Sequence, residues 1–454
     1  MQGLIGLEIH TYLTTKEKLF CRCSVSRERG LKPNVNICPT CTGQPGAKPF
    51  APNAEAVKKA VQIGLMLGCK INNETRWMRK HYSWPDLPKG YQTTMSGAHA
   101  TPLGADGAFE NIRISSMHLE EDPASWEPQT GCVDYNRSGL PLVEIVTAPE
   151  FHFAEEATEW LKKLVHALSY LKTVDANAGI KVDVNVNLTS PKKTERVEIK
   201  NITSIEAIGK AIEYELERQA REGSVRETRR YDEAKGKTIA MRSKEQQDDY
   251  RFIADPDLQA VVIDKKIVDE LKKKLPEMPE AKLKKLITKH KIDKKNAEVL
   301  AKNIDIAEFF EQVAEEGKVK ADFALHWITG ELLRVLNWNK TSLDKVDIKA
   351  GHFIELLKMV EGGLITELQA KEILNKFVPK SFNPLNSEGK ISDKKELENV
   401  VKKVIENNKK AVDDYKKGDE KIVNYLMGEI MKATERRADY KLARAMLEKM
   451  LKAG

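Results

Sequence analysis

Three segments of this chain alternate between apolar and polar residues, and they constrain the fold more than any other feature. The segment 180–188, IKVDVNVNL, alternates throughout, and the segments 4–10 and 196–202 follow the same period of two. This period places apolar side chains on one face of a β-strand and polar side chains on the other. We therefore expect three strands of one antiparallel sheet that has an apolar, buried face and a polar face.

Each of these strands carries a carboxylate among its polar residues. The carboxylates belong to Glu8, Asp183 and Glu198, and His10 follows Glu8 by two positions in its own strand. An acid and an imidazole with this spacing lie on the same face, where they can share a metal or phosphate site. A half-exposed sheet with ordinary polar residues on its outer face is the alternative interpretation.

The segment 112–146 holds the densest run of titratable side chains. It contains HLEED at 118–122, DYNR at 134–137 and then Glu144, between apolar residues that predict buried strands. Carboxylates at this density are costly to bury unless a cation neutralises them, and oxygen ligands favour Mg²⁺. In a shared sheet, Glu121 and Glu144 would converge with the other acids and provide ligands for two adjacent Mg²⁺ sites. A solvated loop between two strands is the alternative.

Four of the six cysteines form two close pairs. Cys21 and Cys23 have the spacing CxC, and Cys38 and Cys41 have the spacing CxxC. Two such pairs separated by a short loop suit a tetrahedral thiolate site for a structural Zn²⁺ in a reducing compartment. Four buried free thiols are the alternative. The other cysteines, Cys69 and Cys132, have no partner by spacing, and we expect them to be small core residues.

Two further segments combine cations with other functional side chains. The segment 79–92, RKHYSWPDLPKGYQ, mixes cations and aromatic rings around two prolines, which predicts an irregular loop that grips phosphate and stacks on a base. A rigid surface loop with its rings packed on the core is the alternative. The segment 225–242 predicts an arginine-rich hairpin around Lys235-Gly236, whose cations serve either nucleic-acid phosphates or surface salt bridges.

Length and composition place the chain among globular proteins of several domains. It has 454 residues, a hydrophobic content of 41% and a net charge of +7, which permits an anionic partner such as tRNA. Mean hydropathy is −0.49 and no apolar run approaches the length of a membrane span. No signal-peptide pattern follows Met1, so we expect a cytoplasmic protein. No phosphate loop, HExxH or GxSxG motif is present, which disfavours P-loop NTPases, zinc proteases and α/β-hydrolases.

The character of the sequence changes near residue 263. Glycine becomes rarer, and helical periodicity with Lys and Glu on the outer faces continues to the C-terminus. We therefore predict an α+β protein with three domains: an antiparallel-sheet domain over 1–262, a helical domain over 263–346 and a helical tail over 347–454. The lysine-rich tail is either a solvated bundle or an RNA-binding element.

Longer motifs follow one another between residues 3 and 258. In chain order they read IGLEIH, LFCRC, ICPTCTGQPGA, RKHYSWPDLPKGYQ, HLEED, VDYNRSGLPLVEIV, EIKN, RETRRYDEAKG, RSKEQQDDYRF and DPDL. At these motifs the sequence closely resembles the B subunit of the tRNA-dependent amidotransferases (GatB). The helical half is similar to the helical and YqeY-like tail domains of the same family. The related archaeal E subunit has an inserted synthetase-like domain for which this chain has no room.

This resemblance implies a cradle-like catalytic domain and an activity. The family is a glutamine-hydrolysing ligase (EC 6.3.5.-) in protein biosynthesis, and its B subunit uses ATP and Mg²⁺ to phosphorylate the side-chain carboxylate of Asp or Glu on misacylated tRNA(Asn) or tRNA(Gln). Ammonia from the amidase, or glutaminase, subunit then displaces phosphate to form the amide. The implied partners are this amidase, a small third subunit and the misacylated tRNA, and the implied cofactors are ATP, Mg²⁺ and Zn²⁺.

The resemblance also assigns residues. The metal and catalytic residues of the family fall on Glu8, His10, Glu121, Glu144, Asp183 and Glu198, with Glu120 and His118 as adjacent candidates. Contacts with nucleotide, substrate or phosphate fall on Lys89, Tyr91, Arg137 and Lys200, and the zinc ligands fall on Cys21, Cys23, Cys38 and Cys41.

Two segments depart from the family pattern. Residues 180–185 read IKVDVN where the family often has Leu-Arg-Cys-Asp-Ala-Asn. Residues 435–440 read ERRADY in place of a Gly- and Pro-containing turn, so we expect the helix there to run on. The competing hypothesis for the whole chain is a non-catalytic tRNA-binding scaffold with a structural zinc. The basic tail favours it, whereas the converging acids oppose it because they would repel phosphate without a metal.

Overall fold

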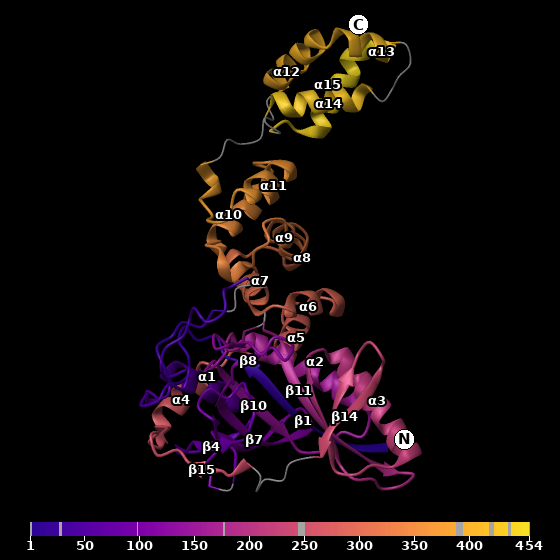
Figure 1. The fold of residues 1–454 in the computed structure, drawn as a ribbon. Coiled ribbons are helices and arrows are strands. Elements are labelled where there is room, and N and C mark those ends of the chain that lie inside the picture. Colours follow the sequence, from indigo (N-terminus) through magenta and orange to yellow (C-terminus); the bar gives the residue numbers. More distant parts are fainter. Residues whose placement is uncertain are drawn as a thin grey trace. The chain divides into compact units, whose positions relative to one another are not determined.

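The computed structural model in Figure 1 describes residues 2–26, 30–97, 99–175, 178–243, 250–386, 394–416, 422–434 and 437–453. Residues 244–249 of the RSKEQQDDYRF motif therefore lie outside the described residues. The chain divides into two compact units, Met1–Met278 and Pro279–Gly454. The first unit is rich in strands and the second is helical. The expected α+β class with a helical C-terminal region is confirmed.

A nine-stranded sheet forms the centre of the N-terminal unit, in the order β14-β13-β12-β11-β1-β10-β7-β6-β2. Neighbouring strands are antiparallel except for β12 and β13, which are parallel. The predicted antiparallel sheet thus holds for all but one pair. The strands are β1 (Gln2–Tyr12), β2 (Lys70–Ile71), β6 (Gly104–Phe109), β7 (Ile112–Glu121), β10 (Pro141–Thr147), β11 (Ile180–Ser190), β12 (Val197–Ile202), β13 (Glu227–Asp232) and β14 (Lys237–Ser243).

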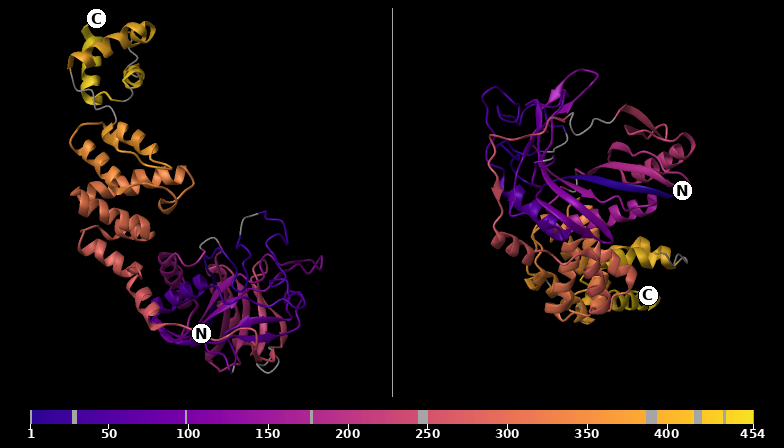
Figure 2. Two further views of the ribbon diagram at one scale, coloured as in Figure 1. Left: turned by 90° about the vertical axis from the view of Figure 1, so that its left-hand side faces the viewer. Right: turned by 90° about the horizontal axis from the view of Figure 1, so that it is seen from below.

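The apolar face of this sheet is buried beneath three helices, which also appear from other sides in Figure 2. These are α1 (Ala54–Met66), α2 (Ala154–Leu171) and α3 (Ile205–Glu222). Ile5, Leu7 and Ile9 of β1 are 0–1% exposed and share one core with the alternating valines of β11. Because one face is buried, a one-residue slip would expose the entire apolar set, so burial fixes the register of each strand. The polar side chains of the same strands therefore face the opposite side.

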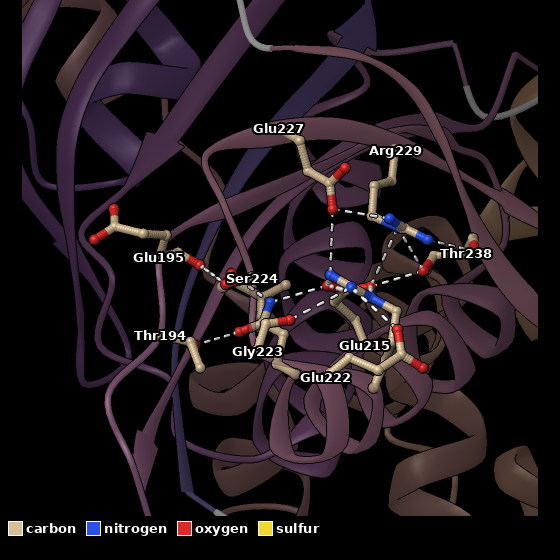
Figure 3. Close-up of polar contacts among 12 residues, drawn as sticks. Thr194, Glu195, Glu215, Glu222, Gly223, Ser224, Glu227, Arg229 and Thr238 are labelled. Atoms are coloured by element: carbon tan, nitrogen blue, oxygen red, sulfur yellow. Dashed lines mark hydrogen bonds and ion pairs between the residues drawn. The ribbon is translucent and has the colours of Figure 1, made fainter.

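The parallel pair arises because α3 connects β12 to β13. Figure 3 shows the polar cluster that fastens β13 and β14 to this helix. Glu215 on α3 is fully buried and accepts hydrogen bonds from Arg218 Nη2 at 2.6 Å and from Thr238 Oγ1 at 2.7 Å. Arg229 Nε lies 3.6 Å from the same carboxylate, and Arg229 Nη1 donates to Glu227 at 2.8 Å. Arg229 therefore forms salt bridges, as one of the two interpretations expected, but these are largely buried and do not lie at the surface.

Smaller sheets lie beside the main one. Three strands pair as β15 (Ile253–Ala254), β4 (Met78–His81) and β5 (Tyr91–Thr94), so the ends of the segment 79–92 are strands and only its middle is irregular. The remaining short pairs are β3 (Glu74–Thr75) with β16 (Val261–Val262), and β8 (Ser125–Trp126) with β9 (Val133–Asp134). The helix α4 (Lys265–Lys273) also belongs to this unit.

The C-terminal unit begins with helices that surround one apolar core, in which Phe310, Trp327 and Phe353 are 0–1% exposed. No helix in the described part of the chain is long and apolar enough to cross a membrane. The elements are α5 (Pro279–Thr288), α6 (Lys294–Ala301), α7 (Ile304–Gly317), α8 (Ala321–His326), the π-helix η2 (Trp327–Leu332), α9 (Leu333–Trp338), the 3₁₀ turn η3 (Leu343–Lys345), α10 (Ala350–Glu361), α11 (Glu367–Asn375) and the 3₁₀ turn η4 (Pro384–Asn386).

A separate apolar core holds the last four helices together, and it includes Leu426, Ile430 and Leu447. The expectation that the helix runs on through 435–440 is wrong. The helix α14 ends at Ala433 and α15 begins at Tyr440, where Asp439 Oδ1 accepts a hydrogen bond from the Leu442 N–H. Residues 435–436 themselves lie outside the described residues. The four helices are α12 (Lys394–Asn407), α13 (Lys409–Lys416), α14 (Ile422–Ala433) and α15 (Tyr440–Ala453).

The buried cluster on α3 generates a stability prediction. Glu215→Gln removes the charge that compensates Arg218 and Arg229, and breaking a buried ion pair by removing one partner costs about 3–5 kcal/mol. We expect this loss in the free energy of unfolding of the N-terminal unit, measured by urea titration of the full chain with circular dichroism. Glu217→Gln, at an exposed position one half-turn away on α3, is the control and should change it by less than about 0.5 kcal/mol. Equal effects of the two substitutions would contradict a stabilising role for the cluster.

Candidate active site

The register of β1 with its neighbours brings titratable side chains together on the polar face of the sheet. Glu8 lies opposite Asp183 on β11, and His10 lies opposite Glu144 on β10. Glu144 in turn lies opposite His118 on β7. Directly opposed residues in antiparallel strands have Cβ atoms about 4.5–5.5 Å apart, so their side chains interact. Residues from distant parts of the sequence thus form one continuous polar surface.

A first group of potential metal ligands combines one imidazole with two carboxylates. One ligand atom from each of His10, Glu120 and Glu144 lies within 4.8 Å of the other two. His10 Nε2 is 3.4 Å from Glu144 Oε1, and His118 Nδ1 is 2.7 Å from Glu144 Oε2. Oxygen and imidazole donors at this separation suit a divalent cation such as Mg²⁺ or Mn²⁺.

A second group consists of three carboxylates, Glu8, Asp183 and Glu198, whose oxygens also lie within 4.8 Å of one another. Lys200 Nζ lies 2.6 Å from Asp183 Oδ2 and 2.9 Å from Glu198 Oε1, so an ammonium already offsets part of their charge. Thr228 Oγ1 on β13 donates to Glu198 Oε2 at 3.2 Å. The expected convergence of acids from three strands is thus present in the structure.

Glu121 lies outside both groups, and its neighbour Glu120 belongs to the first. The β7–β10 register shifts between Ile114 and Ser116, after which His118 and Glu120 face the polar side and Glu121 faces the other. Glu121 Oε1 there accepts hydrogen bonds from the Thr93 N–H at 3.2 Å and from Lys89 Nζ. The structure therefore assigns to Glu120 the position that the sequence-based interpretation gave to Glu121.

The electrostatics of the two groups show how much negative charge they concentrate. Burial, together with the charge of Glu144, raises the pKa values of Glu8 and Glu120 above the usual range for glutamate. Burial alone would lower the pKa of His10, but the hydrogen bond and charge of Glu144 raise it to about 9. Burial would likewise raise the pKa of Glu144, yet the two imidazoles hold it well below its ordinary value. These opposing shifts show that the charges of the two groups interact strongly with one another.

A cavity of about 810 Å³ lies over both groups. Its lining includes ligand residues from each group together with four cations, namely Lys80, Arg137, Lys181 and Lys200. Aromatic rings supply another part of the wall. Tyr82 and Tyr250 pack edge to face with ring centroids 6.1 Å apart, and Lys80 Nζ lies 4.4 Å from the centroid of Tyr250. The cavity thus combines acids suited to metal, cations suited to phosphate, and rings suited to a base.

Two of the predicted phosphate contacts serve other purposes in this structure. Lys89 pairs with Glu121 and also donates to Thr93 Oγ1 at 3.2 Å, and Arg79 lies 4.4 Å above the ring of Tyr91. Neither Lys89 nor Tyr91 is among the described residues that line the cavity. The other two predicted contacts, Arg137 and Lys200, do line it.

Arg137 is held at one end of the cavity by backbone carbonyls. Its Nε donates to the Pro123 carbonyl at 3.0 Å and lies 3.4 Å from Asp122 Oδ2, and its Nη2 donates to the Ala124 carbonyl at 2.5 Å. Tyr12 Oη donates to the same Asp122 oxygen at 2.5 Å. These contacts fix the guanidinium in place before any ligand binds.

The four paired cysteines converge as expected. One sulfur from each lies within 4.8 Å of the others, and Cys41 Sγ is 4.0 Å from Cys23 Sγ and 3.9 Å from Cys38 Sγ. Tetrahedral Zn²⁺ with Zn–S bonds of about 2.3 Å requires S···S separations of roughly 3.8 Å, so this donor set fits zinc. The hydrogen bond from Cys21 lowers the pKa of Cys41 to about 5. Of the remaining cysteines, Cys69 is buried as expected, whereas Cys132 is exposed, so the core expectation for Cys132 is wrong.

The site residues chosen from the sequence do not include Lys80, Lys181 or Asp122, although all three line the cavity and Lys80 belongs to the loop 79–92 that was expected to grip phosphate. Lys181 carried a usable signal because it lies two positions from Asp183 and therefore shares its face of β11. Lys80 and Asp122 depend on the packing of β4 and of the turn after β7, which no periodicity in the sequence records.

The raised pKa of His10 generates a pH prediction. Its folded-state value of about 9 exceeds the ordinary 6.5, so the metal-free protein holds this proton at pH 7 and loses it, with its stabilising ion pair, as pH rises through 9. A cation bound to the imidazole must displace the proton. We therefore expect Mn²⁺ binding at pH 7 to release about one proton per ion and to tighten about tenfold from pH 7 to 8, as measured by calorimetry in two buffers. An affinity independent of pH would contradict this assignment.

Comparison with known proteins agrees with this geometry. Residues 3–269 match the GatB/GatE catalytic domain, and residues 308–451 match the GatB domain with its YqeY-type region. A protein of Methanocaldococcus jannaschii, named as the B subunit of aspartyl/glutamyl-tRNA(Asn/Gln) amidotransferase, is 43% identical over 98% of this chain and 97% of its own length. Proteins of the same name from Methanothermobacter thermautotrophicus and Methanopyrus kandleri are 41% and 40% identical, over 96% and 98% of this chain and 97% and 98% of their own lengths.

The matched residues include both ligand groups, the cavity and the cysteine cluster. The resemblance stated from the sequence motifs is therefore confirmed, and this chain belongs to the family of aspartyl/glutamyl-tRNA(Asn/Gln) amidotransferase B subunits.

Proposed function

We propose that this chain activates the side-chain carboxylate of Asp or Glu esterified to tRNA(Asn) or tRNA(Gln), and that it does so on the polar face of the β1–β10–β11 sheet. The observation that carries the proposal is the placement of two ligand groups and four cations around one cavity. The chain would thus be the kinase and transamidase component of a glutamine-hydrolysing ligase in protein biosynthesis.

The proposed reaction has two displacements. A carboxylate oxygen of the aminoacyl group attacks the γ-phosphorus of ATP, the bond to the β-phosphate oxygen breaks, and ADP leaves. Ammonia then attacks the carbonyl carbon of the acyl phosphate, inorganic phosphate leaves, and a proton of the attacking nitrogen is lost to solvent or a base. This order is chemically necessary because a free carboxylate is a poor acceptor for ammonia, whereas phosphate is a good leaving group.

The two acidic groups would hold the Mg²⁺ that accompanies ATP. His10, Glu120 and Glu144 form one site, and Glu8, Asp183 and Glu198 form the other. Bound Mg²⁺ neutralises phosphate charge and orients the transferring group. His118, through its hydrogen bond to Glu144, fixes the orientation of that carboxylate and acts as a positioning residue. Lys200 limits the repulsion within the second group before nucleotide arrives.

The cations on the cavity wall have a separate role in this proposal. Arg137 and Lys181 belong to neither ligand group. Arg137 reaches the cavity from the turn before β10, and Lys181 reaches it from β11. Both are placed to bind phosphate oxygens, and the Arg137 fork matches a phosphate bidentately. The rings of Tyr82 and Tyr250 offer a stacking surface for a nucleoside, either of ATP or of the tRNA terminus.

The remaining elements of the proposal concern partners and cofactors. Family membership implies partner subunits and tRNA, and we assign the supply of ammonia to an amidase subunit, with a small third subunit as a further partner. We also propose that the cysteine cluster holds Zn²⁺, that the helical tail over 347–454 docks on tRNA, and that the complex acts in the cytoplasm. A purely scaffolding role is not favoured, because the converging acids that line the cavity would repel tRNA phosphates in the absence of a metal.

Two adjacent glutamates provide a sharp test of the metal assignment. Glu120 faces the first ligand group, whereas Glu121 faces Lys89 on the other side of β7. We expect Glu120→Gln to weaken Mn²⁺ binding about 10–100-fold, in line with the loss of a ligand or its support, and to reduce ATP-dependent amide formation at least as strongly. Glu121→Gln should keep Mn²⁺ binding within about threefold of the unsubstituted chain.

The two variants are to be compared by Mn²⁺ electron paramagnetic resonance and by amide formation with the partner subunits present. Normal Mn²⁺ binding in Glu120→Gln, together with loss of Mn²⁺ binding in Glu121→Gln, would show that Glu121 is the metal ligand and would contradict the assignment of Glu120. Normal turnover in both variants would remove the phosphoryl-transfer function from this face of the sheet.

A further inference from the structure

A fully buried lysine lies between the cysteine cluster and the turn that carries Arg137. The side chain of Lys18 is 0% exposed and is among the largest fully buried side chains of the protein. Lysine is almost never fully buried unless its ammonium is paired, because the charge loses its hydration. The partners of this ammonium therefore indicate what the surrounding cluster contains.

The contacts of Lys18 point to a negatively charged sulfur. Its Nζ lies 3.5 Å from Cys41 Sγ and donates to the Tyr135 carbonyl at 3.1 Å. Within the part of the chain that the structure describes, no carboxylate forms an ion pair with this Nζ. The Cys38 N–H also donates to Cys41 Sγ, at 3.2 Å. A sulfur that receives both an ammonium and a backbone N–H is in an environment built for a thiolate.

A zinc ion with four thiolates would supply the missing charge. Two positive charges and four negative ones leave the cluster with a net charge of about −2, because thiolate is the ligand form of cysteine. One buried ammonium reduces this excess and itself becomes paired. We propose that Lys18 is the counter-cation of a zinc–tetrathiolate cluster and that it ties this cluster to the turn that positions Arg137. This inference rests on the zinc assignment made above.

The second half of the proposal follows from the contacts of that turn. Lys18 reaches the carbonyl of Tyr135, and Ser138 Oγ donates to the Cys41 carbonyl at 2.7 Å. The Leu19 N–H donates to the Gly139 carbonyl at 2.9 Å. Arg137 lies between these attachment points and lines the cavity. The cluster and its lysine thus hold both sides of the turn from which the guanidinium projects.

Gly139 lies beside the lysine stem and the ligand cysteine. Gly139 has φ +82°, and a Cβ built there would lie 3.5 Å from Lys18 Cδ and 3.8 Å from Cys41 Cβ. The backbone of the turn is therefore a close neighbour of the lysine stem and of Cys41. Loss of the Lys18 ammonium, or of the zinc–thiolate cluster whose charge it balances, would therefore loosen the turn 136–140.

The experiment compares Lys18→Met, which keeps the length of the side chain without its charge, with Lys16→Met at an exposed position two residues earlier. The full chain is purified with its partner subunits, its zinc content is measured by mass spectrometry, and the rate of zinc transfer to a chromogenic chelator is recorded. We expect about one zinc per chain in the unsubstituted protein and about tenfold faster zinc release from Lys18→Met. Substitution of a residue that supports a metal ligand typically weakens metal binding about 10–100-fold, and tenfold is the lower end of this range. Lys16→Met should release zinc at the unsubstituted rate.

Hydrogen exchange measures the turn directly, and weaker zinc binding alone would not change the exchange rates of its amides in the zinc-loaded protein. In zinc-loaded Lys18→Met, the amides of 136–140 should exchange faster than in zinc-loaded Lys16→Met, because the turn has lost its tie to Nζ. If Lys18→Met does not fold, acetylation of amines in the unsubstituted protein replaces it. Lys18 should be protected while zinc is bound and react after chelation, whereas Lys16 should react in both states.

The outcomes separate this inference from the one on which it rests. An unsubstituted protein that folds and functions without zinc at its cysteine cluster overturns the zinc assignment and the role of Lys18 with it. A zinc-loaded protein in which Lys18→Met changes neither the release rate nor the exchange of 136–140 overturns the role of Lys18 alone. Lys18 that stays unreactive after zinc is removed also contradicts the proposal.

Discussion

The architecture depends on one electrostatic constraint, namely that seven acidic or imidazole side chains crowd the polar face of a single sheet. His10, Glu144 and His118 interact across three adjacent strands, and Asp183 and Glu8 face each other beside them. Such a face is tolerable only when each charge has a partner. In this structure the partners are the imidazoles of His10 and His118 and the ammonium of Lys200, and the proposed Mg²⁺ ions would add to this set.

The rest of the N-terminal unit holds that face in register. The apolar sides of the same strands pack beneath α1, α2 and α3. The hydrophobic core that stabilises the sheet therefore also fixes the acidic side chains on the opposite face. The edge of the sheet is fixed differently, through the buried Glu215 on α3 and the arginines around it. This cluster orients β13, whose Thr228 supports Glu198, and thereby links the interior of the unit to the second ligand group.

Sequence patterns predicted what depends on strand periodicity. The alternation in 180–188 located β11 and the face of Asp183, and the cysteine spacing located a four-sulfur cluster. Glu121 was assigned by its match to the family motif, whereas the alternation His118-Leu119-Glu120, with Leu119 in the core, places Glu120 on the polar face beside His118. Lys89 and Lys18 depend on contacts with distant segments, and Tyr91 depends on the pairing of β4 with β5, so only the folded structure assigns their partners.

The most direct test of the account is ADP formation by this chain co-purified with its amidase partner. The assay uses Mg-ATP with Asp-tRNA(Asn), with Glu-tRNA(Gln) and with the same tRNAs uncharged. We predict a burst of ADP only with an aminoacylated tRNA, and its loss in Glu144→Gln, because that carboxylate connects His10 to His118 at the centre of the first ligand group. Equal ADP formation with charged and uncharged tRNA, or an unchanged burst in Glu144→Gln, would contradict phosphoryl transfer on this face of the sheet.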